Sequence, residues 1–183
     1  ETEITIPIEP EYKFDESRLE ARYQQLSQKM RTQIAGTMYV SGEDPGVDAL
    51  IYQQEQIFQN LVKERQELSA NARDAALSYN KRKESYDKLI DVYRQLEEFA
   101  LEYGDKENAM TYSNIAGYEE LNAELLGLQT RYNEIQAANA ALDDTVKDET
   151  ERERFRGEYT REAATITEQM ISALIKSKTM LTD

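Results

Sequence analysis

The chain has 183 residues, of which 39% are hydrophobic and 32% are charged, with 7 Gly and 3 Pro. Its net charge of −14 disfavours binding to a nucleic-acid backbone or an anionic lipid surface and leaves a basic partner or none. Cysteine and histidine are both absent, which removes disulfides, thiolate nucleophiles, the commonest metal ligand and the usual general base at neutral pH. We therefore expect no enzymatic activity, no metal site and no cofactor.

Residues 1–14 predict an extended arm. Prolines at positions 7 and 10 exclude a helix and restrict a strand to a sheet edge. The apolar residues that alternate with polar ones are Ile4, Ile6 and Ile8. One reading is a linker or strap along a helical bundle, and the other is a strand that pairs with another subunit or with a removed upstream domain.

A first helix is expected over about 16–40, because apolar residues recur there in steps of four and three after a possible N-cap at Asp15. The segment from Ser41 to Gly46 combines two glycines with Asp44 and Pro45, which is typical of a turn followed by a new helix.

The next segment, about 45–103, predicts one very long helix with a heptad seam that does not skip a residue. Its seam positions are Val47, Ile51, Gln54, Phe58, Leu61, Arg65, Leu68, Ala72, Ala75, Tyr79, Arg82, Tyr86, Leu89, Tyr93, Leu96, Ala100 and Tyr103. Such a sustained period of 3.5 residues favours a helix that keeps one stripe against partner helices.

Gly104 suits the left-handed position after a helix, and Asp105 can cap the helix that follows. Two more helices are expected, over about 106–145 and 148–181. The break between them, near 143–150, contains no Gly or Pro and rests on capping residues and a change of register.

The seam contains polar residues that are candidates for partner contacts or for fixing helix register. Tyr79, Tyr86 and Tyr93 occupy one heptad position three times in succession. They predict either a wide core with hydroxyl groups at its rim or an aromatic stripe exposed to a partner protein.

Arg65 and Arg82 interrupt the same seam. A guanidinium in a dry core is costly, so each should meet a carboxylate from a facing helix or mark a point where the seam opens to water, and a recognition role is the alternative. Asn139 lies in the seam of the following helix, where a lone Asn commonly fixes register.

Paired carboxylates occur at 97–98, 119–120 and 143–144. A di-metal carboxylate bundle normally also needs histidine on two helices, so we do not assign these pairs to a metal.

The fold class predicted is all-α: an elongated antiparallel helical bundle or coiled coil of three to four helices, forming a single domain over 15–183 after the arm of 1–14. The leading function is a structural or adaptor protein that mediates protein–protein assembly, with itself or in a larger complex. The alternative is an acidic inhibitor, chaperone or nucleic-acid mimic that binds a basic partner.

The start at Glu1 rather than Met favours a processed or trimmed chain, and with the proline-bearing arm it suggests an exported or cell-envelope component. No apolar run approaches the length of a membrane span.

Overall fold

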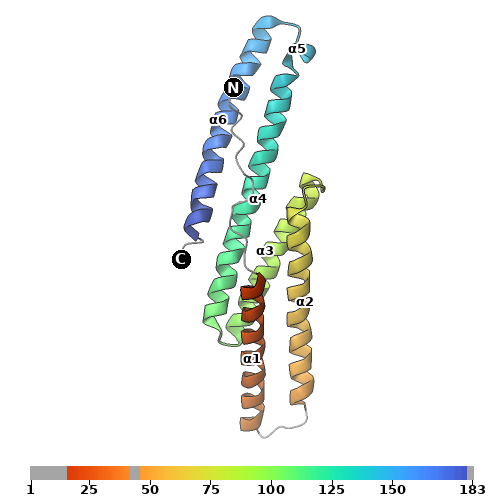
Figure 1. Cartoon of the computed structure of the whole chain (residues 1–183), viewed down its shortest axis with the longest axis vertical. Helices are drawn as coiled ribbons and strands as arrows, with labels where there is room; N and C mark the ends of the chain where they lie inside the picture. Colours follow the sequence, from red (N-terminus) through yellow and green to blue (C-terminus); the bar gives the residue numbers. More distant parts are fainter. Residues whose placement is uncertain (1–15, 42–45, 181–183) are drawn as a thin grey trace. The chain divides into compact units, whose positions relative to one another are not determined.

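The computed structural model describes residues 16–41 and 46–180, and every regular element in those ranges is a helix (Figure 1). The helices are α1 (Glu16–Ser41), α2 (Val47–Arg73), α3 (Tyr79–Glu102), α4 (Lys106–Ala140), α5 (Leu142–Thr145) and α6 (Glu149–Met180). The all-helical class is therefore confirmed, whereas α4 ends at Ala140 and not near 145 as expected. The arm with Ile4, Ile6 and Ile8, the cap at Asp15 and the turn residues 42–45 lie outside the described residues.

The single helix expected over 45–103 is wrong, because the chain leaves the helical path between Arg73 and Tyr79. Asp74 has extended backbone angles, and its Oδ1 accepts a hydrogen bond from the Ala76 N–H at 2.9 Å. Ser78 is the N-cap of α3, with its Oγ 3.4 Å from the Lys81 nitrogen. Asp and Ser satisfy backbone groups outside a helix, so they can end one helix and start the next without Gly or Pro.

The reversal cannot be recognised from the heptad pattern. The helices α2 and α3 fold back on each other, and the seam residues of both face the same core. Phe58 stacks on Phe99 with ring centroids 5.2 Å apart, and Arg65 lies within 3.5 Å of the Tyr93 hydroxyl. These pairs run in opposite directions along the two helices, which therefore form an antiparallel hairpin (Figure 1). A period of 3.5 residues is unchanged by such a turn if the loop preserves the phase of the stripe.

The chain divides into two compact units, with the described residues up to Glu120 in one and those from Leu121 onward in the other. The single domain expected over 15–183 stays a prediction. We call the first the four-helix unit, because it contains α1, α2, α3 and the beginning of α4, and the second the α4–α6 unit.

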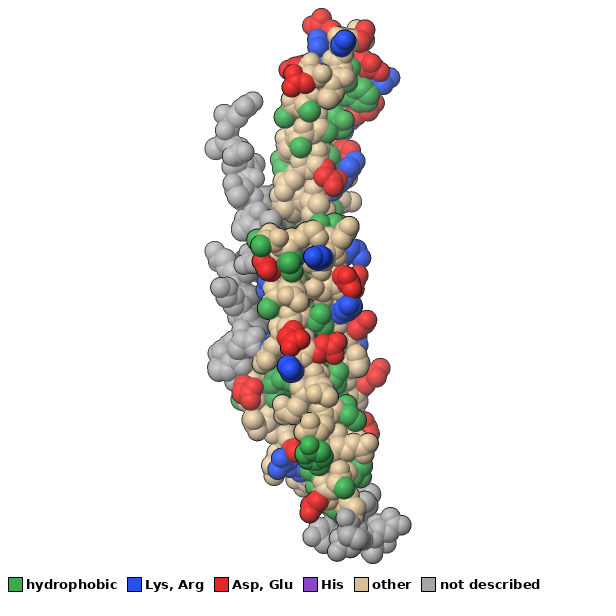
Figure 2. All heavy atoms as spheres, turned by 90° about the vertical axis from the view of Figure 1, so that its right-hand side faces the viewer, with side chains coloured by type: hydrophobic (Ala, Val, Ile, Leu, Met, Phe, Trp, Pro, Cys, Tyr) green, Lys and Arg blue, Asp and Glu red, His purple; other side chains and the backbone are tan. Residues whose placement is uncertain are grey.

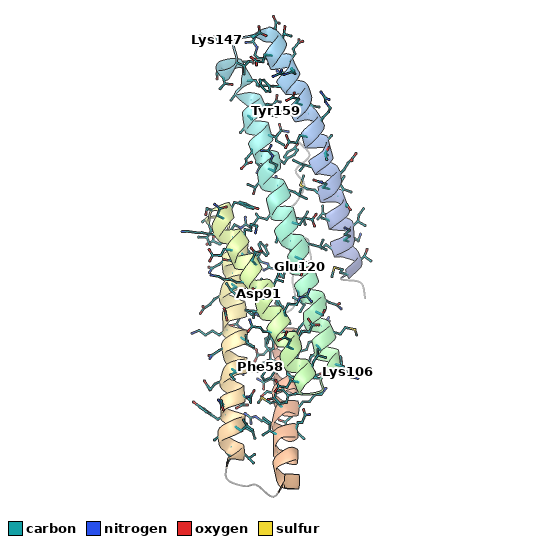
Figure 3. The ribbon with its side chains drawn as sticks, turned by 180° about the vertical axis from the view of Figure 1, so that it is seen from behind. Phe58, Asp91, Lys106, Glu120, Lys147 and Tyr159 are labelled. Carbon is teal, nitrogen blue, oxygen red and sulfur yellow. The ribbon has the colours of Figure 1, made fainter. Side chains whose placement is uncertain are left out.

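The core of the four-helix unit is rich in aromatic side chains. Phe58 is fully buried and also contacts Tyr23 of α1 edge-on, with ring centroids 5.8 Å apart (Figure 3). Tyr23 in turn stacks on Tyr112 of α4 at 6.3 Å. Aromatic rings from all four helices thus pack in one core. Leu89 and Leu96 of α3 are fully buried in the same core.

The α4–α6 unit is a helical hairpin with a narrower core. The end of α4 and the length of α6 lie side by side (Figures 1 and 3). The buried residues of this core are Leu125, Ile135, Ile166, Met170 and Ala173. Asp148 caps α6 by accepting a hydrogen bond from the Glu151 N–H at 2.9 Å, which explains the break expected between 143 and 150.

Two glycine substitutions should change stability in opposite directions. Gly104 has a φ of +71° and no atom within 4 Å of the position that an alanine methyl group would take, so Gly104→Ala should cost about 1–2 kcal/mol from backbone strain alone. Gly36 is exposed within α1 and is equally uncrowded, so Gly36→Ala should gain about 0.5–1 kcal/mol. Urea unfolding measures the change in the free energy of unfolding for each variant. Changes of the same sign in both variants would contradict the left-handed turn at Gly104.

Candidate functional site

The clearest concentration of buried charge in the described residues lies where α2, α3 and α4 meet. Glu119 on α4 has a side chain that is 2% exposed, and its Oε1 lies 2.5 Å from Nη2 of Arg73, at the end of α2. Burial lowers the pKa of Arg73, but the neighbouring Glu119 carboxylate more than compensates, so the net shift is upward and the guanidinium stays charged. This pair ties the first part of α4 to the end of α2.

Arg65 and Tyr93 lie in the same region. Arg65 is 2% exposed, and its Nη1 lies 3.5 Å from the Tyr93 hydroxyl. Burial raises the pKa of Tyr93, and the Arg65 guanidinium offsets only part of that shift. The phenol is therefore neutral at physiological pH and can act as a hydrogen-bond acceptor for the arginine.

A second buried polar cluster connects α1 to the start of α4. Asp105 is 1% exposed and receives hydrogen bonds from the backbone N–H and the Nδ2 of Asn108, at 3.2 and 2.6 Å. Lys29 of α1 places its Nζ 3.0 Å from Oδ1 of Asp105, and Arg22 donates to Oδ1 of Asn108 at 3.1 Å. The cap expected from the sequence at Asp105 is thus confirmed, and it also joins two helices.

Burial raises the pKa of the Asp105 carboxyl, but the hydrogen bonds from Lys29 and Asn108 outweigh it and hold the pKa below its usual value. A lowered folded-state pKa means that the ionised carboxylate stabilises the fold above the unfolded-state pKa near 4, and that this stability is lost as the pH falls through the folded-state pKa.

Asp105→Asn should therefore lower the free energy of unfolding at pH 7 by about 1–3 kcal/mol, and the difference from wild type should shrink below about pH 4. Asp148→Asn is the matched control, because Asp148 also caps a helix but is exposed. Urea unfolding at several pH values measures this. A difference between the Asp105 variant and wild type that stays constant from pH 7 to pH 3 would contradict the role of the charge.

Of the polar seam residues singled out from the sequence, only some lie together in the core. Tyr86 and Tyr93 are buried, whereas Tyr79 is half-buried at the start of α3. The two buried tyrosines fit core packing rather than an aromatic stripe exposed to a partner. The Tyr93 hydroxyl lies inside, next to Arg65, and not at the rim.

Arg82 and Asn139 do not join the buried cluster. Arg82 donates from Nε to the carbonyl oxygen of Ala72 at 2.9 Å, so it satisfies the end of α2 and does not meet a carboxylate in the described part of the chain. Asn139 is half-buried on α4, and its Oδ1 is buried without a hydrogen-bond partner among residues 16–41 and 46–180.

Sequence reasoning missed the roles of Glu119, Arg73 and Lys29. The sequence shows only that Glu119 belongs to the carboxylate pair at 119–120. In the structure Glu119 is buried, and its neighbour Glu120 faces outward to Arg94, 3.1 Å away. Only the packing of α4 on the hairpin distinguishes the two carboxylates.

Many charged side chains outside these clusters form ion pairs on the surface. Arg94 bridges to Glu97 and Glu120, Arg131 to Glu162, and Arg156 to Asp143. On the face in Figure 2, acidic and basic side chains are interspersed. Exposed pairs of this kind contribute little stability, but they reduce the density of unpaired negative charge that a basic ligand would contact.

The surface also carries large apolar side chains. Those exposed among the described residues are Tyr52, Ile57, Leu101, Met110, Ile171 and Ile175. Ile171 and Ile175 are four residues apart on α6 and therefore share one helix face. The other four belong to α2, α3 and α4 of the four-helix unit.

No group of three or more carboxylates positioned to hold a metal ion occurs within the described ranges. None of the helices described is both long and apolar enough to cross a membrane. Neither a protein-family model, nor a curated protein, nor a solved structure matches the chain.

Proposed function

We propose that the chain is a structural or adaptor protein that mediates protein–protein assembly through the outer faces of its helices. The observation that carries this proposal is the exposed apolar pair on α6, where Ile171 and Ile175 are 49% and 62% exposed on one face. Single exposed apolar residues are ordinary, whereas an apolar stripe along a helix is typical of a surface that another helix or a groove covers.

The buried charges support the same reading. Glu119 is held by Arg73 of α2, and Asp105 is held by Lys29 of α1 and by Asn108 of α4. The contacts with Arg73 and Lys29 fix the helices relative to one another within the four-helix unit. A carboxylate whose oxygens are occupied in this way is poorly placed to accept a substrate proton. These two carboxylates therefore suit a role in stabilising the fold better than a role in catalysis.

The interspersed surface charge favours an adaptor over an acidic mimic. Nucleic-acid mimicry needs a dense field of one sign, and Arg94, Arg131 and Arg156 interrupt the acidic clusters with ion pairs. The net charge of −14 then keeps the chain from non-specific association and leaves recognition to local surfaces.

Cross-linking mass spectrometry of complexes captured from the native source tests this function. The full chain serves as bait, and a lysine-reactive reagent reports contacts through Lys176 and Lys178, which directly follow the exposed pair on α6. A partner cross-linked to these lysines should be lost when the bait carries Ile171→Ser and Ile175→Ser. Identical captures by both baits, or no cross-linked protein with either, would count against the proposal.

A further inference from the structure

Helix α6 carries two apolar stripes on different faces. The first faces α4 and contains Ile166, Met170 and Ala173, each of which is buried. The second is rotated by roughly 120° from Met170 if each residue turns the helix by about 100°. Its residues are Gly157, Thr160, Ala164, Ile171 and Ile175, and Glu168 and Lys178 lie at its two edges.

The second stripe is not covered by the described structure. Ala164 and both isoleucines are exposed, and neither Glu168 nor Lys178 has an ion-pair partner among the described residues. The α4–α6 unit is a two-helix hairpin, whereas helical bundles usually enclose an apolar stripe with a third or fourth helix. A helix that covered this stripe would present apolar residues to Ile171 and Ile175 and charges complementary to Glu168 and Lys178.

A second copy of α6, running antiparallel, meets both conditions over residues 166–180, and Gly157, Thr160 and Ala164 lie outside this overlap. When two copies are aligned about residue 173, Ile171 of one copy lies opposite Ile175 of the other. The same alignment places Glu168 opposite Lys178, and the twofold symmetry forms this charge pair twice. A parallel alignment instead places Glu168 beside Glu168 and Lys178 beside Lys178, which is unfavourable at both ends.

We therefore propose that the part of the second stripe around Ile171 and Ile175 is a homodimer interface, in which two α6 helices pack antiparallel over residues 166–180 and two α4–α6 hairpins form a four-helix arrangement along this overlap. This inference rests on the proposed assembly function and names the chain itself as the partner. The contact involves few large side chains and the chain is strongly acidic, so we expect a weak dimer that forms at micromolar or higher concentration.

Sedimentation equilibrium of the purified full chain over a wide concentration range tests the interface. Wild type should shift reversibly from monomer to dimer. Ile175→Asp should raise the dissociation constant at least tenfold, whereas Leu101→Asp, the same change at an exposed position of α3, should not. A wild-type chain that stays monomeric to several hundred micromolar, or equal effects of the two variants, would overturn the proposal.

The charge pair provides a test that does not alter the apolar residues. Glu168→Lys and Lys178→Glu should each weaken the dimer, and the double variant should restore it, because the swapped charges again oppose each other. Both positions are exposed, so helicity measured by circular dichroism should be unchanged. No rescue in the double variant would reject the antiparallel alignment. A monomer that still captures a partner protein from the native source would reject the dimer and leave the adaptor function standing.

Discussion

Replacing Leu89 by aspartate should unfold the four-helix unit. Leu89 is completely buried in the core of α3, where removing a leucine side chain alone costs about 2–5 kcal/mol. Burying a carboxylate without a partner adds further cost, so the total should reach about 5 kcal/mol or more. That value is comparable with the whole stability of a typical domain.

The matched control is Leu101→Asp, which makes the same chemical change on the same helix at a side chain that is 54% exposed. It should shift the stability by less than about 0.5 kcal/mol. Thermal and urea unfolding followed by circular dichroism compare the two variants. Similar losses of stability at both positions would show that the inner face of α3 is not the one assigned here.

Replacing Glu119 by glutamine should produce the second large loss. Removing one partner of a buried ion pair costs about 3–5 kcal/mol, because the other charge is left without compensation. Arg73 is 34% exposed at its side chain and can turn toward water, so we expect a smaller value, about 2–3 kcal/mol. The loss should persist at high salt, since buried pairs are screened only weakly.

Glu120→Gln is the control, since Glu120 is the next residue and forms an exposed bridge with Arg94. It should cost no more than about 1 kcal/mol, and salt should reduce that cost. Urea unfolding at low and high salt measures both variants. Equal losses of stability in the Glu119 and Glu120 variants would contradict the packing of the Glu119 face of α4 against the α2–α3 hairpin.

The sequence predicts the helical class well because apolar periodicity and capping residues act locally. Gly104 ends α3 in the left-handed conformation, and Asp105 caps α4, as their residue types imply. Asp74 and Ser78 have the same capping chemistry, but they lie within a heptad seam that continues without a skip. A heptad pattern reports which face is buried, and it does not report whether the helix continues or reverses.

The polar interior could not be predicted to the same degree, because it depends on which helices meet. Arg65 was expected to need a partner, but the Tyr93 hydroxyl is brought to it only by the reversal at 74–78. Glu119 and Glu120 are chemically identical neighbours, and the packing of α4 alone decides which is buried.

The reversal between α2 and α3 is the central structural claim, because the aromatic core and the Arg73–Glu119 pair both depend on it. The distance between spin labels at Ile57→Cys and Leu101→Cys, measured by pulsed electron paramagnetic resonance, tests it most directly. Both positions are exposed, and the chain has no native cysteine to label. The hairpin predicts a distance of about 30 Å or less, given helices packed about 8–10 Å apart and flexible labels. A continuous helix would separate the two positions by about 66 Å, and a distance near that value would contradict the account.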